Sequence, residues 1–240
     1  MTALLFRDDP YLKTAQATVI GHTDEGGIRV DRSIFYPQGG GQPGDSGKVL
    51  WDGAVCEVAS TVKSRDGASV VLVPSQPDPL PPTGAEIEML IDWDRRYRFM
   101  RMHTALHLLS VVVPLPVTGG QIGFEKSRLD FVMPQVIYDR EFIQGRLGQL
   151  IDADSPVSEQ WITEAQLDAN PDLVKTLSVT PPRGAGRIRL VQIGEGDAPV
   201  DLQPCGGTHV RRTGEIGRVR VGKIENKGKQ NRRISLTLES

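Results

Sequence analysis

The chain of 240 residues is poor in cysteine and has no long apolar run. Two cysteines cannot build a disulfide framework, and such sparse use is typical of a protein from a reducing cytoplasm. No segment approaches the roughly 20 apolar residues of a membrane-spanning helix. Asp8, Asp9 and Pro10 lie where a secretion signal needs an apolar core. We therefore expect a cytoplasmic protein with no membrane partner.

The sequence also lacks a strong net charge of either sign. Its formal charge of −2 gives no global attraction to polyanions, so a nucleic-acid site has to come from local clustering. A hydrophobic fraction of 38% and a charged fraction of 24% are typical of soluble globular proteins. The length suffices for one large domain or two modest ones.

Histidine is scarce but concentrated. Three of the four histidines and one of the two cysteines fall in two short motifs, His103-Thr-Ala-Leu-His107 and Cys205-Gly-Gly-Thr-His209. Imidazole nitrogens and a thiolate are ligands that zinc prefers. Each motif alone has an ordinary structural explanation, a buried histidine pair or a turn with a buried thiol. Their joint occurrence favours one Zn²⁺ ion bound by His103, His107, Cys205 and His209, which leaves Cys56 as a small buried residue of a strand.

The two motifs differ in their expected local structure. Apolar residues recur at roughly helical spacing between Trp93 and Val113, and Pro114 ends the run. Residues four apart share one face of a helix, so both histidines of the first motif can bind the same ion. A proline before the second motif and a glycine pair within it predict a tight loop. Thr104 stands where a zinc peptidase has its glutamate base, which argues against a protease of that type.

The hydrophobic pattern predicts an α+β protein in two domains. Residues 1–92 contain short alternating runs that we interpret as a small β-barrel, with the proline-rich stretch 74–82 as a loop inside it. Residues 93–240 mix helices with a mostly antiparallel sheet. The predicted barrel strands are 17–20, 27–31, 47–51, 54–62, 69–73 and 86–91. In the second domain we predict strands at 127–132, 187–193, 216–224 and 234–238, and helices at 93–113, 139–151 and 159–169.

A glycine-rich string, Phe35-Tyr-Pro-Gln-Gly-Gly-Gly-Gln-Pro-Gly-Asp45, is the second chemical signal. Its composition fits an ordinary hairpin or loop, and no Gly-Lys-Ser/Thr follows as in a nucleotide-binding P-loop. The functional alternative is a surface stripped of side chains, where backbone N–H groups of Gly39, Gly40 and Gly41 and the amide of Gln42 contact a substrate. Gln42 is then the candidate for orienting water or ribose hydroxyls.

Local positive charge is the third signal. Nine basic residues and two acidic ones lie between Arg211 and Arg233, and four arginines occur within 95–101. Charge runs are commonly solvated faces, but both runs adjoin the proposed metal ligands in sequence. They therefore predict a path for a phosphate backbone toward the zinc. The candidate contacts are Arg101, Arg212, Lys227 and Arg232.

Five motifs together resemble the editing region of alanyl-tRNA synthetase and its free-standing relatives, the alanyl-tRNA trans-editing proteins. They are the glycine-rich string, the two metal motifs, Thr213-Gly-Glu-Ile-Gly217 and the tail 224–234. The resemblance runs from about Phe6 to the end, with the motifs in the right order. The resemblance implies a β-barrel followed by a zinc-containing editing domain that deacylates seryl- or glycyl-tRNA(Ala). We see no room for an ATP-binding catalytic domain, so we expect action in trans, without ATP. The family's synthetases often have a hydroxyl residue where this chain has Leu106, so the sequence does not predict a preference between serine and glycine.

Such a second site has a clear chemical purpose. A pocket for alanine discriminates poorly against glycine and serine, because one methylene or hydroxyl is worth only about 1 to 3 kcal/mol there. Zinc can either lower the pKa of a bound water to about 7 or anchor the substrate, and the first role needs an open coordination position. The sequence leaves both alternatives open and identifies no general base. Two other functions also remain open: an RNA-binding module with a structural zinc, and a hydrolase of small esters or amides.

Overall fold

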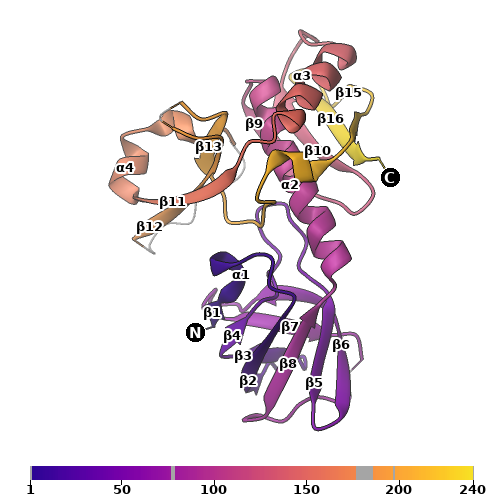
Figure 1. The fold of residues 1–240 in the computed structure, drawn as a ribbon, viewed down its shortest axis with the longest axis vertical. Helices are drawn as coiled ribbons and strands as arrows, with labels where there is room; N and C mark the ends of the chain where they lie inside the picture. The colour runs from indigo at the N-terminus through magenta and orange to yellow at the C-terminus, as the bar shows by residue number, and fades with distance from the viewer. Residues whose placement is uncertain (1, 77–78, 177–185, 197, 240) are drawn as a thin grey trace. The chain divides into compact units, whose positions relative to one another are not determined.

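The computed structural model describes residues 2–76, 79–176, 186–196 and 198–239 (Figure 1). The chain forms two compact units, Met1–Arg98 and Phe99–Ser240, and the division lies within helix α2 (Trp93–Val112). In the described ranges, no helix has both the length and the apolar character needed to cross a membrane.

The first unit contains a closed barrel of six strands in the order β2-β3-β7-β6-β5-β8. All of its ladders are antiparallel. A short helix, α1 (Leu5–Asp8), follows β1 (Ala3–Leu4), which pairs in parallel with β4 (Arg32–Ser33). The predicted barrel is confirmed; residues 77 and 78 of the proline-rich stretch lie outside the described residues. The barrel strands are β2 (Thr14–His22), β3 (Ile28–Val30), β5 (Gly47–Trp51), β6 (Ala54–Lys63), β7 (Val70–Pro74) and β8 (Glu86–Ile91).

Alternation of side chains explains the barrel core. Along β8, Ile87 and Met89 are buried, whereas Glu86 is exposed. Cys56 on β6 is buried in the same apolar cluster, as expected for a small hydrophobic residue of a strand.

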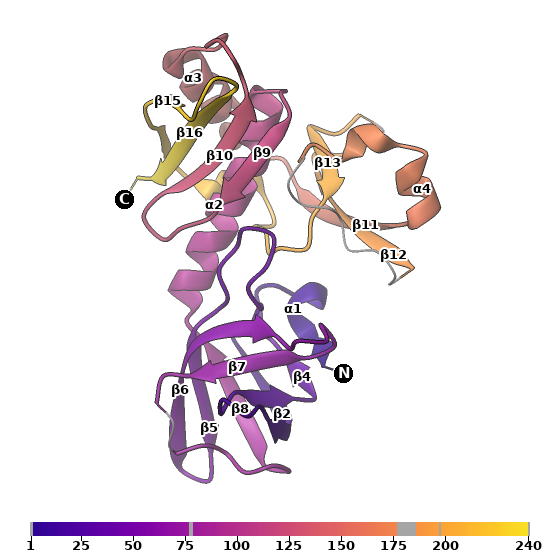
Figure 2. The ribbon, with the colours of Figure 1, turned by 180° about the vertical axis from the view of Figure 1, so that it is seen from behind.

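The second unit is α+β, as predicted. One sheet has the order β14-β16-β10-β9, with β15 added to β16, and a second sheet has the order β11-β12-β13. Every described pairing in these two sheets is antiparallel. Figures 1 and 2 show α2 beside strands β9 and β10. The strands are β9 (Val117–Gln121), β10 (Ser127–Val132), β11 (Val157–Thr163), β12 (Arg187–Ile193), β13 (Asp201–Pro204), β14 (Val219–Val221), β15 (Glu225–Asn226) and β16 (Asn231–Leu238).

Capping residues set where the helices begin. The carboxylate of Asp92 accepts a hydrogen bond from the backbone N–H of Arg95 at 3.1 Å, just before α2. Asp139 caps α3 (Arg140–Asp152) by accepting from the N–H of Phe142 at 2.7 Å. The described part of this unit also contains two short 3₁₀ turns, η1 (Pro171–Leu173) and η2 (Thr213–Ile216).

The predicted helix over 159–169 is wrong in its first half. Residues 157–163 form β11, which pairs with β12 along its whole length. Helix α4 (Glu164–Asp168) begins only at a capping box, in which Thr163 and Gln166 exchange hydrogen bonds. The strand predicted over 216–224 is also too long. Its first residue, Ile216, is the last residue of η2, and Gly217 at φ 67° and Arg218 lie between it and β14 (Val219–Val221).

Candidate functional site

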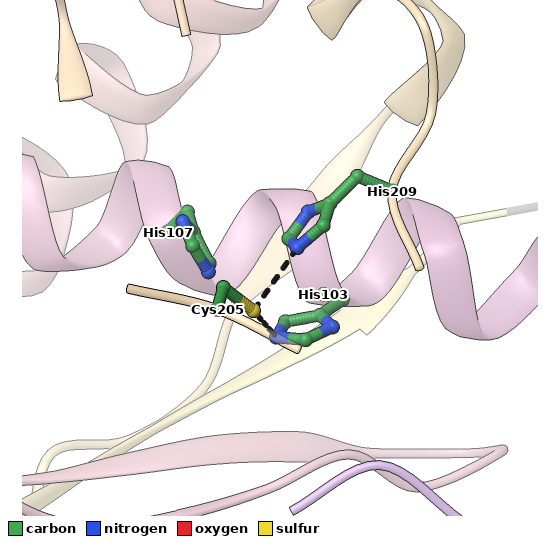
Figure 3. A group of neighbouring side chains, drawn as sticks. All are labelled: His103, His107, Cys205 and His209. Atoms are coloured by element: carbon green, nitrogen blue, oxygen red, sulfur yellow. Dashed lines mark hydrogen bonds between the residues drawn. The ribbon is translucent and has the colours of Figure 1, made fainter. Parts of the chain in front are cut away.

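The structure brings the two histidine-bearing motifs together around one point. His103 and His107 lie one turn apart on α2, and Cys205 and His209 lie in the loop after β13. One ligand atom from each residue lies within 4.8 Å of each of the others. Figure 3 shows the thiol between the imidazoles, which reach it from the helix and from the loop. All four residues that the sequence predicted as metal ligands therefore form one group.

The spacing of this group fits a tetrahedral metal site. The Sγ atom of Cys205 lies 3.4 Å from Nε2 of His103 and 3.3 Å from Nε2 of His209. Ligand atoms placed 2.0 to 2.3 Å from a common centre at tetrahedral angles are about 3.3 to 3.8 Å apart. Three imidazoles and a thiolate are also a ligand set that suits zinc. The group can therefore hold a metal ion.

A buried carboxylate orients the imidazole of His107. Oδ2 of Asp201 lies 2.9 Å from Nδ1 of His107, and the same oxygen accepts a hydrogen bond from Nε2 of Gln203 at 2.8 Å. Lys175 donates to the other carboxylate oxygen. A proton on Nδ1 directed at Asp201 leaves Nε2 of His107 free to face the centre. The sequence interpretation missed Asp201; its one signal was alternation along β13, which buries Asp201 and Gln203 together.

A threonine does the same for His209. The hydroxyl of Thr104 lies 3.1 Å from Nδ1 of His209 and donates to the carbonyl of Met100 at 3.0 Å. It also accepts from the N–H of Val210 at 3.3 Å. Thr104, which stands where a zinc peptidase has its glutamate base, thus contacts the metal-binding loop directly.

The electrostatics of two of these side chains suit metal binding. Burial raises the pKa of the Cys205 thiol, but the imidazoles of His103 and His209 outweigh burial and hold this pKa well below its ordinary value. Burial, aided by His103, brings the pKa of His209 well below its usual range. These shifts favour a thiolate and a neutral imidazole, the forms that bind metal.

The His107–Asp201 pair has opposite shifts. Burial lowers the pKa of His107, but the hydrogen bond to Asp201 and the contact with Cys205 outweigh burial and raise it to about 9. Burial raises the pKa of Asp201, yet His107 and Lys175 bring it down to about 2. Asp201 is therefore ionised at neutral pH and supports a positive charge at the centre.

The glycine-rich string forms a tight turn in the first unit. Gly39 and Gln42 exchange two backbone hydrogen bonds, of 3.1 and 3.0 Å. Gly40 and Gly41 occupy the two central positions at φ 57° and 81°, the left-handed conformations of a type I′ turn. Gln42 is buried with 1% of its surface exposed, at the base of this turn.

A buried ion pair closes the same loop. Asp45 accepts from the N–H of Tyr36 at 2.6 Å and pairs with the guanidinium of Arg96, which is fully buried. Arg96 also donates to the carbonyls of Pro10 and Ile34. Arg96 belongs to the run of arginines that the sequence predicted as a phosphate path, and for this residue that prediction is wrong. The positive charge of Arg96 is paired with Asp45 inside the first unit and does not face solvent.

The four predicted tRNA-contacting cations all have partners within the protein. Nε of Arg101 donates to the carbonyl of Ile216 at 2.9 Å. Arg212 pairs with Asp154 at 2.7 Å, and Lys227 pairs with Glu225 at 3.3 Å. Arg232 donates to several carbonyls, including that of Pro134 at 2.7 Å.

Other cations of the same stretch are better placed to meet a ligand. Their side chains are exposed, and no described residue pairs with them. They are Arg218, Arg220, Lys223 and Lys229.

Comparison with known proteins identifies the family. Residues 188–235 match the family described as threonyl and alanyl tRNA synthetase second additional domain. The chain is 35% identical over 247 residues to alanyl-tRNA editing protein AlaX-M of Methanosarcina acetivorans, covering 99% of each protein. The chain belongs to the alanyl-tRNA editing protein family. It is also 30% identical over 245 residues to alanyl-tRNA editing protein AlaX-L of Pyrococcus horikoshii, covering 99% of this chain and 58% of that protein. The alanine–tRNA ligase of Pyrobaculum neutrophilum is 34% identical over 233 residues, 93% of this chain and 25% of the ligase.

In this member of the alanyl-tRNA editing protein family, the matched segment supplies only half of the metal-binding group. Residues 188–235 include Cys205 and His209, whereas His103 and His107 precede the segment on α2. The group is therefore completed by a helix outside the matched domain.

Proposed function

We propose that this protein is a zinc-dependent aminoacyl-tRNA deacylase that acts in trans, without ATP, on tRNA(Ala) carrying serine or glycine. The observation that carries the proposal is the meeting of three imidazoles and one thiol at a single point, in a chain similar along its length to proteins named for alanyl-tRNA editing. We assign the zinc to His103, His107, Cys205 and His209.

The chain's own residues prepare this centre. Zinc, when bound, acts as a Lewis acid toward an ester carbonyl or a water molecule, or anchors the substrate. Asp201 and Thr104 hold the Nδ1 atoms of His107 and His209, so that both Nε2 atoms face the centre. Ester hydrolysis needs water alone as the second reactant, which agrees with a reaction that consumes no ATP.

The two predicted domains have different roles in this proposal. We assign deacylation to residues 93–240, and contacts to the 3′ end of the tRNA to the barrel, residues 1–92. Backbone N–H groups at the tip of the turn Gly39–Gln42 are the proposed contacts, because Gly40 has no side chain to keep a nucleotide away. Gln42 was the sequence candidate for orienting water or a ribose hydroxyl, but it is only 1% exposed at the base of the turn, so we propose that it supports the turn instead.

The basic stretch after the metal-binding loop supplies the electrostatic part of tRNA binding. Of the residues predicted to contact tRNA, Arg212 and Lys227 keep an exposed face beside their ion pairs. Arg101 and Arg232 are more covered and hold backbone carbonyls. We propose that the unpaired cations of the same stretch, such as Arg220 and Lys223, carry most of the phosphate contacts.

One experiment separates this proposal from its alternatives. Seryl-, glycyl- and alanyl-tRNA(Ala) are incubated with the intact protein without ATP, and release of the amino acid is followed over time. Cys205→Ala should abolish release, because it removes the thiolate of the metal-binding group. Cys56→Ala is the matched control, since it removes the other cysteine, which lies in the barrel core. A chelator should stop the reaction, and added Zn²⁺ should restore it.

The outcomes discriminate clearly. If the intact protein releases serine and glycine no faster than the spontaneous rate, the deacylase proposal fails. Tight tRNA binding in that case identifies an RNA-binding module with a structural zinc. Hydrolysis of small esters at a rate independent of tRNA and of salt identifies a general hydrolase instead.

A further inference from the structure

A buried arginine outside every sequence motif contacts the metal-binding loop. Arg189 lies on β12, next to β13, which ends one residue before Cys205. The backbone N–H of Cys205 donates to the carbonyl of Arg189 at 3.2 Å, so the ladder between the two strands continues to the first residue of the loop. The side chain of Arg189 is only 7% exposed.

The guanidinium holds two carbonyls of this loop. Nη1 of Arg189 donates to the carbonyl of Cys205 at 2.7 Å and to that of Gly207 at 2.9 Å. The N–H of Gly207 in turn lies 3.5 Å from Sγ of Cys205 and donates to it. Hydrogen bonds from the guanidinium of Arg189 and to the thiol of Cys205 therefore both hold the conformation of this loop.

The guanidinium is itself oriented from the opposite side. Nη2 donates to Oε1 of Glu159 on β11 at 2.6 Å. A guanidinium is a planar fork of N–H groups, so a carboxylate bound at one end of the fork fixes the direction in which the other N–H groups point. A lysine at this position keeps the charge, but its single ammonium group cannot reproduce the fork.

We propose that Arg189 is a positioning residue for the metal centre, holding the Cys205–Gly207 loop so that the thiol faces the imidazoles of α2. This inference rests on the proposed metal site. Its physical basis is preorganisation: a loop already in its binding conformation loses less conformational freedom when the ion enters. Without the fork, two loop carbonyls lose their donor, and the loop gains other conformations in which the thiol points away.

The test measures metal binding rather than catalysis. Affinity for Zn²⁺ is measured by competition with a chromophoric chelator, and Co²⁺ is used as a spectroscopic probe whose charge-transfer absorption reports thiolate coordination. Arg189→Lys should weaken Zn²⁺ affinity about 10- to 100-fold, as is usual for outer partners of metal ligands, and should reduce the thiolate absorption. Glu159→Gln should shift both readouts in the same direction but less. Arg187→Lys, the same substitution at an exposed position of β12, is the control and should change neither.

Wild-type affinity and absorption in a folded Arg189→Lys protein overturn the inference. If that variant does not fold, as judged by circular dichroism, Glu159→Gln decides: weaker binding supports the inference, and unchanged binding contradicts it. If the wild-type protein binds neither Zn²⁺ nor Co²⁺, the proposed metal site fails, and this inference fails with it. That result differs from the case in which the wild type binds metal and the variants bind it equally well.

Discussion

The hydroxyl of Thr104 lies 3.1 Å from Nδ1 of His209 and donates its own proton to the carbonyl of Met100. Because its proton is used there, the hydroxyl acts as an acceptor toward the imidazole. Nδ1 of His209 is therefore the protonated nitrogen, and Nε2 is left with its lone pair directed at the thiol of Cys205. Thr104, which lies within the His103–His107 motif, thus determines the tautomer of His209, the last residue of the Cys205–His209 motif.

Replacing Thr104 with valine tests this relationship. Thr104→Val keeps the β-branching of the side chain but removes its hydroxyl, so the neutral imidazole of His209 loses the acceptor that favours a proton on Nδ1 and a free Nε2. We expect Zn²⁺ affinity to fall about 10-fold, measured by chelator competition. Thr118→Val, which removes a hydroxyl from β9, is the control and should bind Zn²⁺ as the wild type does. Equal affinity in both variants would show that Thr104 does not orient His209.

Neutralising the unpaired cations should weaken tRNA binding in a salt-dependent way. Arg220→Gln and Lys223→Gln each remove one phosphate contact without breaking an ion pair among the described residues. In a plot of the logarithm of the tRNA association constant against the logarithm of the salt concentration, each substitution should make the negative slope shallower by about 0.7 to 0.9.

The control for this experiment has the same change in charge elsewhere. Arg65→Gln removes a cation whose side chain is 92% exposed on the first unit and should leave the slope unchanged. The measurement is tRNA binding at several salt concentrations by fluorescence anisotropy. Slopes that respond equally to all three substitutions would indicate a general charge effect and no defined contact surface.

Much of the fold was predictable because its determinants are local. Strand β8 alternates buried Ile87 and Met89 with glutamates, and the period of two is visible in the sequence itself. Strand β11 has no such pattern, because Glu159 and Gln160 are polar residues that suit a helix surface equally well. Its strand character comes from pairing with β12, more than twenty residues away, which a local pattern does not contain.

The metal-binding group was predictable for a different reason. Histidine and cysteine are rare in this chain, so their clustering in two motifs was informative without any knowledge of the fold. The residues that orient the ligands are common types whose roles appear only when distant segments meet. Thr104 and His209 are 105 positions apart, and His107 and Asp201 are 94 apart. Similarly, Arg96 was assigned to a basic surface because its sequence neighbours are basic, whereas its partner Asp45 precedes it by 51 positions.

The Asp45–Arg96 pair predicts a large stability effect in the first unit. The two side chains are 1% and 0% exposed, so Asp45→Asn leaves a buried guanidinium without its counter-charge. We expect the free energy of unfolding of this unit to fall by about 3 kcal/mol or more. Asp52→Asn, at an exposed turn position with φ 44°, is the control and should change it by less than about 0.5 kcal/mol.

Urea unfolding of this unit can be followed through Trp51 and Trp93 in a Trp161→Phe background, because Trp161 is the tryptophan of the second unit. A loss below about 1 kcal/mol in Asp45→Asn would mean that the hydrogen bonds made at this position, which an amide oxygen can also accept, hold the loop without the charge of Asp45.

Asp130 predicts a pH dependence of stability in the second unit. Its carboxylate on β10 accepts from Nε and Nη2 of Arg233 on β16 at 2.7 and 2.9 Å, and from Arg128 at 2.6 Å. Burial raises the pKa of Asp130, but the two guanidinium groups outweigh burial and hold it below its ordinary value of 3.8. The folded protein therefore binds this proton less readily than the unfolded chain does. The stabilisation is present in full above the pKa of the unfolded chain, near 3.8, and is lost as the pH falls through the lower pKa that Asp130 has in the folded protein.

Comparing Asp130→Asn with the wild type across pH isolates this contribution. At pH 7 the free energy of unfolding of the variant should be about 1 kcal/mol lower than that of the wild type, which is the upper range for a partly exposed ion pair. The difference should shrink toward zero as Asp130 of the wild type becomes protonated, because both proteins then have a neutral side chain at this position. Glu141→Gln is the control, since Glu141 is 74% exposed and should show little difference at any pH. A gap between Asp130→Asn and the wild type that stays constant down to about pH 2 would assign the effect to packing of the amide and not to the charge of Asp130.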